Sequence, residues 1–174
     1  TKVTVRDIDL QEHGCDGIEA PAEDEDKTVY TYDSESNIWK TYVDDKGDAG
    51  FTTTFYYAPG WAQIADPDFS VDKGKYTVVL PEATSEQWQA QVHIVTTIPA
   101  DADTDYDFSC KFLAKKDING VTVKLTDAAS DDNFFFVNRY DLKAGTEYQV
   151  KIPAVKMGKG KADALKLVFD FGGC

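Results

Sequence analysis

An apolar side chain occupies every second position of Tyr106-Asp107-Phe108-Ser109-Cys110-Lys111-Phe112, and this stretch is the clearest indication of the fold. Successive side chains of a β-strand point to opposite faces of a sheet, so the pattern predicts a strand with one buried face and one solvated face. The same parity places the Cys110 thiol among aromatic rings. It therefore predicts a buried free cysteine rather than a disulfide or a metal ligand.

The same alternation recurs along the chain, between short segments rich in Gly, Asp and Asn that are typical of turns. No segment shows a sustained apolar stripe with the helical period. The pattern predicts about ten short strands, which in 174 residues make one domain, 1–174. We therefore expect an all-β fold, an antiparallel β-sandwich of the jelly-roll type. The clearest strands are residues 76–80, 121–125, 148–152 and 165–171.

The first 26 residues divide into two parts. Residues 1–13 form a strand-like segment in which Val3 and Val5 have one parity and Ile8 and Leu10 the other, which predicts a β-bulge between the pairs. Residues 17–26 are acidic and without periodicity, and we expect an acidic linker or loop there.

Charge and composition exclude several classes of partner. Lys and Arg number 18 against 31 Asp and Glu, a net charge of −13, which disfavours nucleic acid and anionic membrane surfaces. No segment approaches the ~20 consecutive apolar residues of a membrane-spanning helix, so no membrane insertion is expected. The start, Thr1-Lys2-Val3-Thr4, is neither an initiator Met nor a signal peptide, which indicates a piece of a longer protein.

The sequence offers no catalytic constellation. The two histidines, His13 and His93, are far apart, and neither a metalloprotease helix motif nor a Gly-rich phosphate loop occurs. Closely spaced carboxylates of the kind that sandwich-fold glycosidases use are also missing. We therefore expect a protein that is not an enzyme. No cofactor is required, and a structural calcium ion is the one that the loops could hold, at Asp101, Asp103 and Asp105 or at Asp66, Asp68 and Asp72.

Amides and aromatic rings mark a candidate binding surface. In residues 87–94 the set Trp88, Ala90, Val92 and Ile94 has core parity, and the opposite set is Gln87, Gln89, Gln91 and His93. A row of uncharged amides suits a cleft that hydrogen-bonds a neutral ligand, and flat sugar rings stack on aromatic side chains. An ordinary polar outer face is the alternative.

Further aromatic residues extend this surface. Trp61 and Gln63 share a parity opposite to Ile64, and Phe135 takes the face opposite to Phe134 and Phe136. Trp39 is either a second stacking surface or a lid on the core. The predicted carbohydrate-binding residues are Trp61, Gln63, Gln89, Gln91, His93, Phe135 and Trp39.

These motifs, in this order, resemble carbohydrate-binding modules similar to families 4 and 9, which are attached to or inserted in bacterial xylanases and β-glucanases. The resemblance covers roughly residues 37–173 and is carried by residues 55–63, 80–84, 87–92, 106–109, 121–125 and 169–173. It implies a jelly roll that binds single glycan chains along a cleft, and often a structural calcium. It also implies a secreted or cell-surface bacterial location and a covalently linked catalytic domain.

The chain departs from the family in the place of one strand. A pattern that the family usually carries after Phe-Gly-Gly stands at the front here, as Val3-Thr4-Val5-Arg6-Asp7-Ile8-Asp9-Leu10-Gln11-Glu12-His13. Either residues 1–13 are the tail of a preceding tandem module, or the strand order is permuted. Because an unpaired apolar strand is a sticky edge, we expect the segment to dock in the empty place, in its own chain or in a neighbour.

The leading hypothesis is therefore a non-catalytic module that binds a β-linked plant polysaccharide, xylan first and β-glucan second, and targets an attached glycoside hydrolase. A structural or adhesion β-sandwich without a sugar ligand is the alternative.

Overall fold

The computed structural model describes residues 1–12, 39, 52–64, 69–72, 74–101, 103–156 and 163–173, without the side chains of residues 12 and 131–133. The described residues form ten strands and a short 3₁₀ turn, η2 (Gln87–Gln89). The strands are β1 (Lys2–Glu12), β2 (Thr52–Tyr57), β3 (Phe69–Asp72), β4 (Lys75–Val79), β5 (Ala90–Val95), β6 (Asp105–Ala114), β7 (Ile118–Asp127), β8 (Ser130–Leu142), β9 (Glu147–Lys156) and β10 (Leu165–Asp170).

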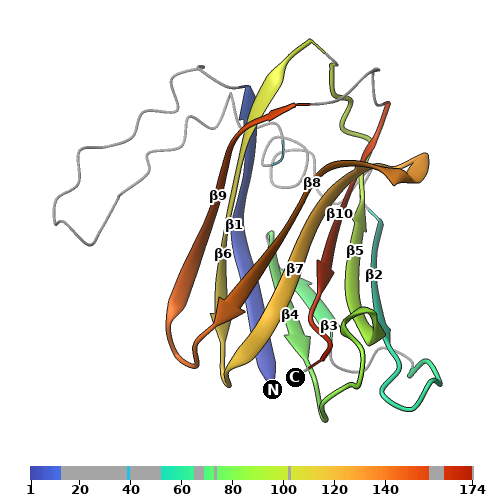
Figure 1. Ribbon diagram of the computed structural model, residues 1–174, viewed down its shortest axis with the longest axis vertical. Helices are drawn as coiled ribbons and strands as arrows, with labels where there is room; N and C mark the ends of the chain where they lie inside the picture. The colour runs from blue at the N-terminus through green and yellow to red at the C-terminus, as the bar shows by residue number, and fades with distance from the viewer. Residues whose placement is uncertain are drawn as a thin grey trace, which may run out of the picture.

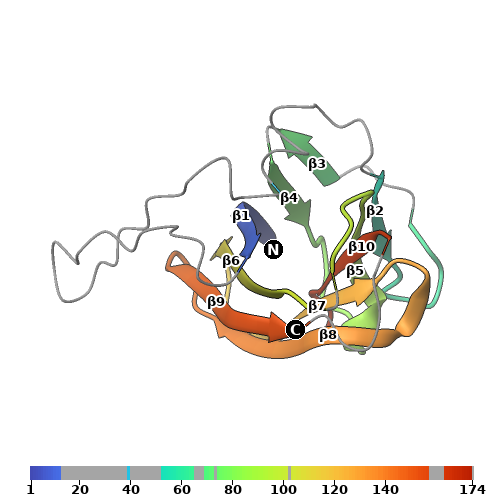
Figure 2. The ribbon, with the colours of Figure 1, turned by 90° about the horizontal axis from the view of Figure 1, so that it is seen from above.

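Two five-stranded antiparallel sheets make the sandwich, in the orders β3-β4-β1-β6-β9 and β2-β5-β10-β7-β8 (Figures 1 and 2). We call them the first and the second sheet. This arrangement confirms the predicted all-β sandwich of the jelly-roll type. Long-range strand pairing links residues from both ends of the sequence, and the two chain ends lie at the same end of the sandwich (Figure 1).

Aromatic rings fill the space between the sheets. Phe112 of β6 meets Phe169 of β10 edge to face at a centroid distance of 5.5 Å, and Phe171 lies 6.2 Å from Phe112. Cys110, two residues before Phe112, is fully buried and carries a free thiol, as its parity predicts. Burial without a charged partner raises the pKa of this thiol, so it is an inert core residue.

Strand β1 lies in the middle of the first sheet, between β4 and β6 of the same chain. Its register shifts between Arg6 and Asp9, so that two residues oppose one on β6, and Asp7 adopts a φ of 52°. This confirms the predicted bulge, which lets Val3 and Val5 as well as Ile8 and Leu10 reach the core. The docking is intramolecular; His13 and residues 17–26 lie outside the described residues.

The register of the second sheet aligns the side chains that point away from the core in three rows. We call these positions the outer face of the second sheet. From β2 to β8 the rows are Tyr56, Gln91, Asp170, Thr122 and Arg139; Thr54, His93, Val168, Lys124 and Val137; and Thr52, Val95, Lys166, Thr126 and Phe134.

Candidate functional site

A directed chain of polar contacts crosses the outer face of the second sheet. Lys124 Nζ lies 2.6 Å from Asp170 Oδ2, and Gln91 Nε2 donates to Asp170 Oδ1 over 2.9 Å. The Gln91 amide oxygen in turn faces His93 Nε2 at 3.0 Å. Asp170 is 4% exposed, so its carboxylate is held by these donors rather than by bulk water.

The chain fixes the hydrogen-bonding state of the imidazole. An ionised carboxylate only accepts, so the Gln91 NH₂ group faces Asp170 and the Gln91 oxygen faces His93. His93 Nε2 must then carry a proton, and in the neutral ring Nδ1 is the acceptor. Gln91 and His93 are both half-buried, so they combine a fixed orientation with access to a partner.

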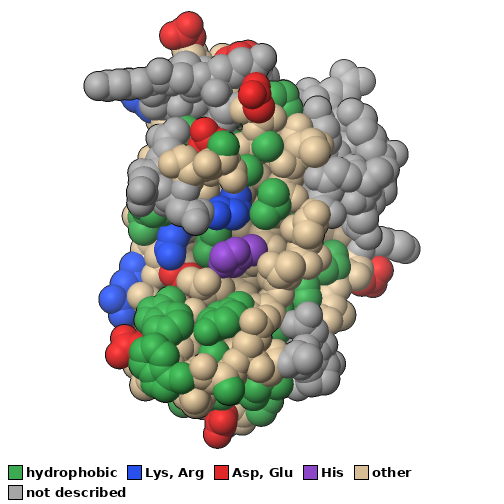
Figure 3. Space-filling view, turned by 90° about the vertical axis from the view of Figure 1, so that its right-hand side faces the viewer, with side chains coloured by type: hydrophobic (Ala, Val, Ile, Leu, Met, Phe, Trp, Pro, Cys, Tyr) green, Lys and Arg blue, Asp and Glu red, His purple; other side chains and the backbone are tan. Residues whose placement is uncertain are grey.

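An aromatic cluster stands at one end of this face. Trp88 stacks on Tyr56 with a centroid distance of 6.5 Å and an interplanar angle of 20°. Trp61 meets Trp88 edge to face at 5.0 Å. Trp61 is 70% exposed and Trp88 39%, so the two indoles present a large apolar surface beside the polar chain. Figure 3 shows hydrophobic side chains gathered next to the imidazole, with basic groups on its other side.

The backbone around Trp61 is held in an uncommon conformation. Trp61 has a φ of 66°, in the left-handed region that costs a non-glycine residue on the order of 1 kcal/mol. The Trp61 N–H donates to Ala58 O, and the Ile64 N–H donates to Tyr57 O over 2.7 Å. These bonds hold the turn that follows β2, and the turn presents the indole to water.

The loop that carries Trp88, residues 80–89, is anchored at several points. The Tyr57 hydroxyl donates to Glu82 O and accepts from Glu82 N–H. Gly172 N–H donates to Gln87 O over 2.9 Å, and Gly173 N–H to Thr84 Oγ1 over 2.8 Å. The Trp88 side chain is thus attached to a constrained loop, which lowers the entropy that a bound partner would have to remove.

The predicted orientations of Trp88 and Gln89 are both wrong. Parity assigns Trp88 to the core and Gln89 to the amide row, but the η2 turn breaks the alternation immediately before β5. Trp88 therefore faces water, and Gln89 is fully buried. The Gln89 side-chain oxygen accepts from Ser85 Oγ and from the Glu86 N–H, so this residue holds the loop.

The prediction that Phe135 lies on the outer face is wrong, because β8 contains a bulge. Leu125 pairs with Phe136 and Thr126 with Phe134, which leaves Phe135 as the extra residue. Phe135 is partly buried against the core, whereas Phe134 is 49% exposed on the outer face. The predicted platform is thus replaced by its neighbour, at the corner of the face diagonal to Tyr56.

The remaining predicted residues, Trp39 and Gln63, lie in different parts of the structure. Trp39 is buried in the core, so of its two readings the structure supports the core one. Residues 61–64 form a bend rather than a strand, and Ile64 is exposed instead of buried. Gln63 is exposed on this bend next to Trp61. Sequence parity missed Tyr56, which alternates with the buried Phe55 and Tyr57, and it missed Trp88, because the η2 turn interrupts the alternation there.

Two features are absent from the part of the chain that the structure describes, a cluster of metal ligands and a membrane-spanning helix. There, no three His, Cys, Asp or Glu side chains converge as a metal site would require. Asp66 and Asp68 lie outside this part of the chain, so the expectation of calcium stays a prediction. No helix in the described part of the chain is long and apolar enough to cross a membrane.

Comparison with known proteins relates the chain to one fold. No family model matches the sequence, and no curated protein matches it. A solved structure described as "CBM4 structure and function" superposes with a TM-score of 0.50 at 16% sequence identity. The match covers 69% of this chain and 76% of that structure. The likeness establishes the fold predicted from the motifs, that of a family 4 carbohydrate-binding module.

Proposed function

We propose that this chain is a non-catalytic carbohydrate-binding module that holds a β-linked polysaccharide on the outer face of the second sheet. Xylan is the first candidate and β-glucan the second. The observation that carries the proposal is the position of the Trp61–Trp88–Tyr56 cluster beside the oriented Gln91 and His93 side chains. Similarity to the solved fold supports it but does not supply the ligand.

The chemistry of the face suits a sugar chain. The C–H face of a pyranose ring stacks on an indole, and Trp88 and Trp61 offer two such surfaces at different angles. Sugar hydroxyls both donate and accept, and the Gln91 amide and the His93 ring supply partners whose direction is already set. Gln63, exposed next to Trp61, is placed to add an amide contact.

The face is also long enough for several sugar units. Five strands spaced by about 4.8 Å make it about 19 Å wide from β2 to β8. Tyr56 and Phe134 stand at diagonal corners, with the polar chain between them. A glycan that lies across the strands would therefore meet an aromatic surface at each end and hydrogen-bonding groups in the middle.

The affinity expected from these contacts is modest. Each solvent-competed hydrogen bond contributes about 1 kcal/mol net, and each stacked ring adds about 1 kcal/mol. A few of each, less the cost of immobilising a flexible glycan, give dissociation constants on the order of micromolar to millimolar. Such an affinity suits a module that keeps an attached glycoside hydrolase near its polymer. We accordingly propose a secreted or cell-surface bacterial setting, with the covalently linked catalytic domain as partner.

Affinity electrophoresis through gels containing xylans, β-glucans or mannans tests the proposal. The wild-type chain should be retarded by a β-linked polymer, and Trp88→Ala should abolish the retardation. Tyr148→Ala is the matched control, because Tyr148 is 37% exposed on β9 of the first sheet, against 39% for Trp88.

Three results would contradict the proposal. Wild-type mobility unchanged in every gel would favour the structural or adhesion sandwich. Release of reducing sugar from any of the polymers would show an enzyme instead. Loss of retardation in Tyr148→Ala but not in Trp88→Ala would move the site to the first sheet.

A further inference from the structure

A hollow of about 190 Å³ lies on the outer face of the second sheet, beside the polar chain. His93 of β5, Lys166 of β10 and Lys124 of β7 contribute to its wall. Phe134 of β8 forms an apolar border. Three of the described lining residues carry basic or imidazole side chains, and none is acidic. The full lining is Gln91, His93, Lys124, Thr126, Phe134, Lys166 and Val168.

The local charge is opposite to that of the whole molecule. The chain carries 31 acidic and 18 basic residues, yet the rows of the outer face contain Lys124, Lys166 and Arg139 against the single acid Asp170. Asp170 is buried and already accepts from Gln91 and Lys124. A ligand in the hollow therefore meets the ammonium groups of Lys124 and Lys166 on a protein whose net charge is negative.

The Lys124 ammonium group is oriented toward a ligand without being consumed by its ion pair. An ammonium has three donors, and the contact with Asp170 Oδ2 uses one of them. The pair also holds the stem of Lys124, whose side chain is 23% exposed, in one position. A basic group fixed in this way binds an anion with less loss of side-chain entropy than a solvated surface lysine would.

We propose that the hollow receives an anionic substituent of the glycan, the carboxylate of a uronic acid carried by an otherwise neutral chain. This inference rests on the proposed function and narrows its substrate class to acidic, sparsely charged polysaccharides. The carboxylate accepts hydrogen bonds from Lys124 and Lys166 while the sugar ring contacts Phe134. A uniformly charged polymer is disfavoured, because the net charge of −13 repels charges that fall outside the hollow.

Isothermal titration with two forms of one polymer tests this inference. The first is glucuronoxylan, and the second is the same preparation with its carboxyl groups reduced to primary alcohols. At low salt the wild-type chain should bind the acidic form about 3- to 10-fold more tightly, a range typical of one partly screened charge pair. The preference should fall as salt is added. Lys166→Gln should lower the preference, because only Lys124 then remains beside the carboxylate, whereas Lys156→Gln on β9 removes the same charge from the first sheet and should retain it.

The outcomes separate the two proposals. Equal affinity for both polymers would overturn the acidic-sugar inference and leave the binding module intact. Binding of neither polymer, nor of any neutral glycan, would overturn the proposed function itself. A sulfated xylan of equal charge density that binds more tightly than glucuronoxylan would assign the hollow to sulfate esters. Tighter binding of polygalacturonate than of glucuronoxylan would contradict the sparse-charge requirement.

Discussion

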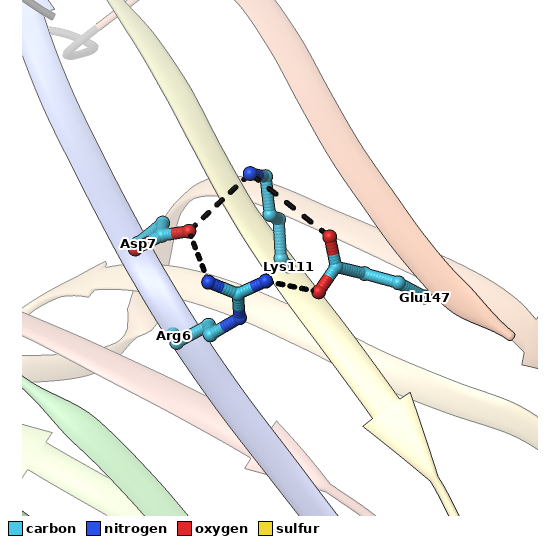
Figure 4. A network of polar contacts seen from close by, with 4 residues as sticks. All are labelled: Arg6, Asp7, Lys111 and Glu147. Carbon is cyan, nitrogen blue, oxygen red and sulfur yellow. Dashed lines mark hydrogen bonds and ion pairs between the residues drawn. The ribbon is translucent and has the colours of Figure 1, made fainter. Parts of the chain in front are cut away.

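The charged side chains are arranged differently on the two outer faces of the sandwich. On the first sheet, Arg6, Asp7, Lys111 and Glu147 form a closed ring of ion pairs among partly exposed side chains (Figure 4). The ring balances two bases against two acids, and solvent reaches all four. On the second sheet, the polar chain runs from Lys124 and Asp170 through Gln91 to His93, and its residues Lys124, Gln91 and His93 line a hollow beside Phe134.

The polar groups of the two faces differ in direction and in burial. A closed, exposed ring contributes little energy and leaves few donors or acceptors directed outward. A chain anchored on a buried carboxylate has a direction, because every donor points toward Asp170. The Gln91 amide and the His93 ring are thereby held in one orientation.

The most disruptive change to the second face should be Gly172→Ala. A Cβ at this position would lie 2.3 Å from Glu86 O and 2.4 Å from Gln87 O, inside the loop that presents Trp88. Overpacking against backbone costs about 1–3 kcal/mol, and we expect about 3 kcal/mol because the loop must detach. Chemical denaturation should show the loss of stability, and glycan binding should vanish. Gly145→Ala is a poor control because its φ is positive, so Gly60→Ala, with open space around it, serves instead. An unchanged melting temperature would show that the loop is not clamped.

Asp9→Asn tests how a buried carboxyl group in the first sheet makes the stability of the protein depend on pH. Asp9 lies on β1, and its Oδ2 atom is buried without a hydrogen-bond partner. Burial, and secondarily the nearby Asp107 carboxylate, raise its pKa to about 7. The unfolded chain loses this proton near pH 4, so the folded state binds the extra proton between about pH 4 and pH 7.

The sign of the Asp9 effect follows from that window. Its contribution to stability is complete below about pH 4 and is lost as the pH rises to 7. Relative to the wild type, Asp9→Asn should therefore gain about 2 kcal/mol between pH 4 and pH 8. Glycan affinity should not change, since Asp9 is on the other sheet. Parallel denaturation curves for both proteins across this range would contradict the assignment.

Asp170→Asn should weaken glycan binding on the second sheet without unfolding the protein. The substitution keeps an acceptor for Gln91 but removes the charge that holds Lys124. We expect a loss of about 1–2 kcal/mol in stability and about tenfold weaker glycan binding, because Gln91 and His93 lose their fixed orientation. Calorimetric titration measures the second effect. Thr122→Ser, in the same row, is the conservative control, and wild-type affinity in Asp170→Asn would remove the polar chain from the site.

The smallest effect should come from Glu147→Ala, which opens the ring on the first sheet. Arg6 and Lys111 retain Asp7, and all these side chains are partly solvated. We expect a change of no more than about 0.5 kcal/mol, further reduced by salt, with unaltered glycan binding. Thermal melts at two salt concentrations measure it. A large loss would mean that the two faces do not differ as described.

Strand parity predicted most of the fold because a period of two survives wherever a strand is regular. It found the core rings of β6, the bulge in β1 and the placement of Gln91 and His93. It failed where the period is interrupted. The η2 turn exchanged Trp88 and Gln89, and the β8 bulge exchanged Phe134 and Phe135. Both interruptions depend on tertiary hydrogen bonds and register, which a local pattern does not contain.

Glycan binding on the outer face of the second sheet is tested most directly by an amide chemical-shift titration with xylohexaose, and with a β-glucan hexaose in parallel. We expect one of them to shift the backbone amide signals of Tyr56, Trp61 and Trp88 and the side-chain amide signal of Gln91, and to leave those of Arg6, Lys111 and Glu147 unchanged. Shifts confined to the first sheet, or a spectrum that neither oligosaccharide alters, would contradict it.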